Sequence, residues 1–102
     1  GHQKMLEIAI ALAAKPKLLL LDEPLGGMST EEVGQALAII AEIKRQGTSV
    51  LLIEHNMKAV MSICDRLLVL NFGMESGRGS PEEVQKNPKV IEAYLGAGQY
   101  AA

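Results

Sequence analysis

The chain of 102 residues is poor in cysteine and in aromatic side chains. Cys64 is its only cysteine, which excludes an intrachain disulfide and a cysteine-rich zinc site. Phe72, Tyr94 and Tyr100 are its only aromatic residues, too few for a surface that stacks single-stranded nucleic acid. Because 48% of the residues are nevertheless hydrophobic, we expect a packed core of aliphatic side chains rather than a disordered chain.

The sequence also lacks a large excess of one charge and any long apolar run. Ten lysine and arginine residues stand against twelve aspartate and glutamate residues, and the formal net charge of −2 gives no reason to expect a nucleic-acid partner. No apolar run approaches the roughly 18 residues that a membrane-spanning helix needs. The length suits one compact domain or part of a larger one.

The chain does contain an alternation of segments with helix and strand periodicity. Apolar residues recur at helical spacing in residues 2–14, and Pro16 ends this helix. Residues 18–21 are consecutive leucines, whose length and flanking prolines favour a strand buried on both faces. The same reasoning predicts a helix from its cap at Ser29 to Gln46, a strand at residues 48–53, a helix at 57–64 and a strand at 67–70. This order is typical of a parallel sheet with right-handed connections.

The pattern weakens after Gly73. Glycine is too frequent in residues 74–79 to predict a strand there. Ser80 begins a capping box with proline at the first helical position, and a last short helix is expected at residues 87–95. The tail from Gly96 consists mostly of small residues and is expected to fray.

Ionisable residues follow two of the predicted strands. Asp22 and Glu23 come directly after the leucines, while Glu54 and His55 come after the next strand. Ligands of open parallel sheets bind beyond the carboxyl ends of the strands, so neighbouring strands would bring three carboxylates and an imidazole to one edge.

That combination suits phosphoryl chemistry. An aspartate at a strand end can hold Mg²⁺ and the phosphate oxygens that the ion bridges, a neighbouring glutamate can polarise a water, and a histidine can donate to the phosphoryl group. A structural interpretation stays open, in which Asp22 or Glu23 caps the chain locally and His55 is a solvated loop residue.

Several segments, in the right order, resemble motifs of the ATP-binding-cassette (ABC) ATPases. Residues 18–24 resemble the Walker B motif with its adjoining glutamate, and residues 52–57 resemble the switch-histidine segment, or H-loop. Residues 1–9 resemble the end of the signature motif and its helix, and residues 25–29 occupy the D-loop position. Residues 80–96 resemble the C-terminal segment of the branched-chain amino-acid and urea importer ATPases.

The resemblance implies an α/β fold, part of a P-loop NTPase domain of the ABC type with parallel strands and flanking helices and without its N-terminal half. It divides the chain into residues 1–79, which hold the motifs, a C-terminal helical segment at residues 80–96 and a tail at residues 97–102.

The resemblance also implies the cofactors ATP and Mg²⁺ and a role for each residue at the strand ends. Asp22 would hold Mg²⁺, directly or through water. Glu23 would act as general base on the attacking water, and His55 would contact the γ-phosphate.

Three further nucleotide-contact candidates come from the resemblance. Gly1 would present its backbone N–H to ATP on an opposing subunit, as helix N-termini do for anions. His2 stands where the signature motif has glutamine, and Ser29 stands where the D-loop has aspartate.

The largest departure from the family is the missing phosphate loop. The chain contains no G-x-x-x-x-G-K-[ST] sequence, so we expect a C-terminal fragment that is inactive by itself. We also expect such a fragment to self-associate through uncovered apolar surface.

The function implied for the intact protein is ATP hydrolysis that energises an ABC importer, most directly for branched-chain amino acids. The implied partners are a second, identical or different ATPase subunit, membrane permease subunits and, indirectly, a periplasmic solute-binding protein, with no nucleic acid. The implied location is peripheral, on the cytoplasmic face of the inner membrane. The alternatives are another solute, such as urea or a lipid, or a dimerisation module without hydrolysis.

Overall fold

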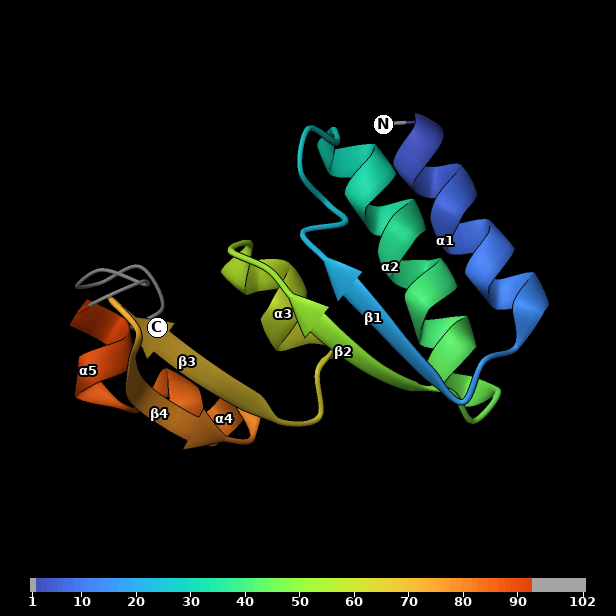
Figure 1. Ribbon diagram of the computed structural model, residues 1–102. Coiled ribbons are helices and arrows are strands. Elements are labelled where there is room, and N and C mark those ends of the chain that lie inside the picture. The colour runs from blue at the N-terminus through green and yellow to red at the C-terminus, as the bar shows by residue number, and fades with distance from the viewer. Residues whose placement is uncertain (1, 93–102) are drawn as a thin grey trace. The chain divides into compact units, whose positions relative to one another are not determined.

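A computed structural model describes residues 2–92 of the chain (Figure 1). The chain forms two compact units, Gly1–Val60 and Met61–Ala102. The expected tail and the last three residues of the expected final helix lie outside the described residues. Within residues 2–92, no helix has the length and apolar character needed to cross a membrane. The subdivision at residues 79 and 96 stays a prediction.

The first unit is built on a pair of parallel strands. Its elements are α1 (His2–Ala14), β1 (Leu18–Asp22), α2 (Thr30–Arg45) and β2 (Ser49–Ile53). The strands pair in register, with Leu20 opposite Leu51 and Asp22 opposite Ile53. Neighbouring parallel strands with an intervening helix confirm the arrangement that periodicity predicted for this part of the chain.

Helices cover one face of this pair. Figure 1 shows α1 and α2 side by side on the same side of β1 and β2. Ile8 of α1 and Ile40 and Ile43 of α2 are buried completely. Side chains of a strand point alternately to its two faces, so the odd and even leucines of β1 meet different surroundings.

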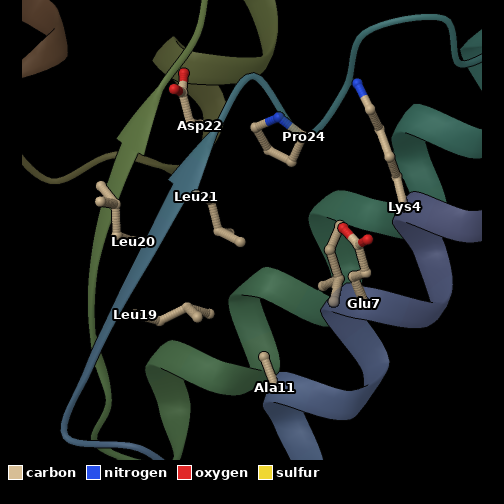
Figure 2. A pocket seen from close by; sticks show the side chains of 9 residues that line it. Lys4, Glu7, Ala11, Leu19, Leu20, Leu21, Asp22 and Pro24 are labelled. Carbon is tan, nitrogen blue, oxygen red and sulfur yellow. The ribbon is translucent and has the colours of Figure 1, made fainter.

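The prediction that β1 is buried on both faces is wrong. Leu18 and Leu20 are 65% and 59% exposed, and Leu51 and Ile53 of β2 are 56% and 47% exposed. α1 and α2 pack on the opposite face, towards which Leu19 and Leu21 point (Figures 1 and 2). We call these four residues the bare sheet face.

The predicted cap of α2 is confirmed. The Glu32 backbone N–H donates to the Ser29 hydroxyl over 3.2 Å, and the Ser29 backbone N–H donates to the Glu32 carboxylate over 3.1 Å. These bonds satisfy donors that the first turn of a helix leaves free. Gly47, after the helix, has a φ of 98°, which glycine adopts easily.

The second unit is a hairpin with two short helices. Helix α3 (Met57–Ile63) begins in the first unit and ends in the second. It is followed by β3 (Leu67–Asn71), β4 (Met74–Gly79), α4 (Pro81–Gln85) and α5 (Pro88–Val90). β3 pairs antiparallel with β4. The strand predicted at residues 67–70 is confirmed by β3.

Residues 74–79 form a strand, contrary to the sequence-based expectation, because their glycines serve the hairpin. Phe72 and Gly73 have φ values of 51° and 75°, the left-handed pair of a tight hairpin turn. A Cβ at Gly77 would lie 2.7 Å from Asn87 Nδ2 and 3.1 Å from Val90 Cγ2. Glycine at this position lets α5 approach β4, and the Asn87 amide donates to the Ser76 carbonyl over 3.1 Å.

The caps of the short helices agree with the sequence pattern. Ser80 and Glu83 form a second capping box with Pro81 at the first turn, and Asn87 caps α5. The Ser80 backbone N–H donates to the Glu83 carboxylate and thereby lowers the pKa of Glu83.

Candidate active site

The carboxyl ends of β1 and β2 lie next to each other. The backbone N–H of Glu23 donates to the Ile53 carbonyl over 2.8 Å, which extends the ladder one residue beyond Asp22. Glu23 is thus held beside the end of β2, immediately before the chain reaches Glu54 and His55. The expectation that these residues share one edge of the sheet is confirmed for Glu23, Glu54 and His55.

Glu23 and His55 form the central contact of this edge. The His55 Nε2 and Glu23 Oε1 atoms are 2.5 Å apart, a contact that is an ion pair when the imidazole is protonated. The side chains are 78% exposed for His55 and 51% exposed for Glu23. A carboxylate oriented by an imidazole and open to solvent can accept a proton from a bound water.

Asp22 lies on the other side of the strand tip. Figure 2 shows its carboxylate and Leu20 on the side of β1 opposite Leu19 and Leu21, which point towards the helices. Asp22 is exposed at the end of β1. No three His, Cys, Asp or Glu side chains among residues 2–92 converge as a metal site. A single exposed carboxylate nevertheless suits Mg²⁺, which keeps several waters and takes its other ligands from phosphates.

The segment after β1 is held in an unusual conformation. Glu23 has a φ of 50°, a left-handed value that non-glycine residues seldom adopt. Pro24 follows it, and Pro24 and Leu25 are buried. Strain of this kind persists only where neighbouring groups fix the backbone, and it gathers at functional sites.

Two side chains fix this backbone. Glu54 accepts the Leu25 N–H at Oε2 over 2.9 Å and the His55 N–H at Oε1 over 3.0 Å. Lys4 on α1 donates to the carbonyl oxygens of Glu23 and Gly26 over 3.0 and 3.2 Å. Figure 2 shows the Lys4 ammonium extending from α1 towards the segment that follows Pro24.

Sequence reasoning assigned no role to these two residues. It placed Glu54 at the strand edge but could not identify the backbone groups that its carboxylate accepts. Lys4 did carry a signal: it lies in the first turn of α1, where the helix dipole disfavours a cation. A lysine at such a position points to a tertiary partner.

A pocket of about 280 Å³ lies between α1 and β1 (Figure 2). The residues that line it are Lys4, Glu7, Ile8, Ala11, Leu19, Leu20, Leu21, Asp22 and Pro24. Apolar side chains form much of its wall, and Lys4, Glu7 and Asp22 add charged groups.

Ser29, a further predicted site residue, lies at the start of α2. Ser29 caps α2, and its hydroxyl accepts the Glu32 N–H. Gly1 and the side chain of His2 lie outside the described residues. Their assignments as nucleotide contacts stay predictions.

Comparison with known proteins supports the motifs. A family model described as a branched-chain amino acid ATP-binding cassette transporter matches residues 78–100. The high-affinity branched-chain amino acid transport ATP-binding protein LivG of Salmonella typhimurium is 46% identical over 97 residues, which cover 94% of this chain and 38% of LivG. The corresponding protein BraF of Pseudomonas aeruginosa is 45% identical over 94% of this chain and 38% of BraF. The lipopolysaccharide export ATP-binding protein LptB of Haemophilus influenzae is 36% identical over 94% of the chain and 40% of LptB.

Solved structures give the same picture. A nucleotide-free ATP-binding cassette from an ABC transporter superposes with a TM-score of 0.77 at 31% identity, over 93% of this chain and 39% of that one. CbiO1 of Clostridium perfringens, part of an ABC transporter complex, gives 0.67 at 31% identity over 83% and 34%. The chain therefore spans less than half the length of the relatives that it matches.

Proposed function

The chain belongs to the ABC ATPase family. From that premise we propose that the edge of the sheet that carries Glu23 and His55 takes part in ATP hydrolysis by an ATP-binding subunit. The observation that carries the proposal is the 2.5 Å contact between Glu23 Oε1 and His55 Nε2 at the tips of two paired parallel strands. Loss of hydrolysis would leave no reason to keep this exposed pair together, because exposed ion pairs contribute little to stability.

In the proposed reaction, Glu23 is the general base. A water oxygen attacks the γ-phosphorus of ATP, the bond to the bridging oxygen of ADP breaks, and the proton of the water passes to the Glu23 carboxylate. His55 orients that carboxylate through Nε2 and can turn the same N–H towards a γ-phosphate oxygen. Bound Mg²⁺ would neutralise charge on the phosphate oxygens, and Asp22 is the side chain that would hold it, directly or through water.

The wider assignment rests on the relatives. LivG and BraF are named as branched-chain amino acid transport proteins, which favours import of such amino acids. We therefore propose a cassette that pairs with a second cassette, identical or different, beneath permease subunits at the cytoplasmic face of the inner membrane, fed by a solute-binding protein. LptB, at lower identity, makes a lipid the alternative cargo, and urea is a further one.

The first test is ATP turnover by a complete cassette that carries these 102 residues. Glu23→Gln keeps the shape but removes the base, so we expect turnover to fall at least about a hundredfold while ATP still binds. His55→Ala should lower turnover as well. The matched control is Glu31→Gln, an exposed glutamate in the first turn of α2, which should leave turnover unchanged.

Two outcomes would contradict the assignment. Equal turnover by Glu23→Gln and wild type would remove Glu23 from the chemistry. ATP binding without any hydrolysis by the wild-type cassette would favour the non-hydrolytic dimerisation module. Cargo is tested separately, by asking whether leucine, urea or a lipid is transported when the cassette is reconstituted with its permease.

A further inference from the structure

We propose that Lys4 and Glu54 are positioning residues that hold Glu23 and His55 in their working geometry by bracing one backbone segment from two sides. The proposal rests on the proposed hydrolytic function. We call residues 23–26 the braced segment, because both side chains bond to its backbone.

Glu54 forms the brace on the strand side. Its two carboxylate oxygens accept N–H groups from two separate loops, Leu25 after β1 and His55 after β2. The side chain is partly buried, so these charge-assisted bonds are weakened less by water than bonds at an open surface. One planar group therefore sets the distance between the loop of the base and the loop of the imidazole.

Lys4 forms the brace on the helix side. Its ammonium group bonds to the Glu23 and Gly26 carbonyls and so closes the turn from the opposite direction. A Cβ at Gly26 would lie 3.0 Å from Lys4 Nζ, so glycine there permits the close approach. These bonds also compensate for a cation in the first turn of a helix.

The brace has a specific task, which is to keep Glu23 in its left-handed conformation before a proline. A residue that precedes proline prefers extended backbone, so the observed φ of 50° needs support from outside the segment. Relaxation of this residue would redirect the carboxylate away from His55. Misplacement of a catalytic group by about 1 Å can cost about a hundredfold in rate.

The test compares Lys4→Met and Glu54→Ala in a complete cassette with two controls that remove similar groups elsewhere. Lys86→Met removes an exposed lysine after α4, and Glu42→Ala removes a carboxylate that accepts bonds from Arg45 within α2. We expect kcat to fall about tenfold to a hundredfold in both brace variants, with KM for ATP changed less than about twofold, and no change in the controls. Lys4→Arg should recover most of kcat, because its guanidinium can still donate to carbonyl oxygens.

A second measurement keeps the inference independent of folding and of hydrolysis. Amide hydrogen exchange at Leu25 should become faster in Glu54→Ala, and Glu54→Gln, which retains only one suitable acceptor, should give a smaller increase. Unchanged kcat and unchanged Leu25 exchange in folded variants would overturn the brace. If the wild type does not hydrolyse ATP at all, the proposed function fails, and the exchange rates alone decide whether the brace exists.

Discussion

At the scale of single residues, Ser29 shows how a residue beside a candidate site can be committed to local structure. Its hydroxyl accepts the Glu32 N–H, and its backbone N–H donates to the Glu32 carboxylate. Ser80 and Glu83 make the same two bonds at α4, in the second unit. The two serines therefore provide a matched pair, one in the unit that holds Glu23 and one in the other unit.

Replacing Ser29 separates a cap from a nucleotide contact. Ser29→Ala should lower the free energy of unfolding by about 1 kcal/mol, and Ser29→Asp should preserve it because aspartate is an equally good cap. Urea unfolding of the complete cassette measures the loss, and Ser80→Ala should give a loss of similar size. If Ser29→Ala weakens ATP binding while Ser80→Ala, with a similar loss of stability, does not, then Ser29 contacts nucleotide as well.

At the scale of elements, helix bounds could be predicted where residues near the helix ends determine them. The bounds of α1 and α2 follow from Pro16, Ser29 and Gly47, residues that act within a few positions of themselves. β4 could not be predicted in this way, because Gly77 is explained only by the close approach of Asn87 and Val90, which come later in the chain. Strand order was enough to predict that Glu23 and His55 lie at one edge of the sheet. The backbone groups that Lys4 and Glu54 bind could not be predicted, because they depend on the conformation of the loops.

Two glycine substitutions test this explanation, and they should change the free energy of unfolding in opposite directions. Gly77→Ala places a methyl group against Asn87 and Val90, so we expect a loss of about 1–3 kcal/mol of stability. Gly34→Ala lies inside α2, where a Cβ meets nothing within 4 Å, so we expect a gain of about 0.5–1 kcal/mol. Urea unfolding of the complete cassette measures both. A neutral Gly77→Ala would mean that the short contact relaxes freely and that the glycine is not needed for packing.

At the scale of the whole chain, the bare sheet face sets the behaviour of the 102 residues by themselves. A run of leucines carries no sign of which face is covered, because both faces are equally apolar. The coverage depends on which other elements pack on the strands, and α1 and α2 pack on one side. The outcome is four large aliphatic side chains exposed side by side.

Such a face should drive the isolated chain to self-associate. Leu20 and Leu51 face each other across the strand pair and are 59% and 56% exposed, so a contact between two copies would remove adjoining apolar surface from water. Sedimentation velocity should therefore find oligomers, and the double variant Leu20→Lys, Leu51→Lys should shift them towards monomer. Gln35→Lys, an exposed position on α2, adds a positive charge away from this face and should not. A monomeric wild-type chain that melts cooperatively would show that the bare sheet face is tolerated in water, since neither association nor loss of cooperativity would then follow from its exposure.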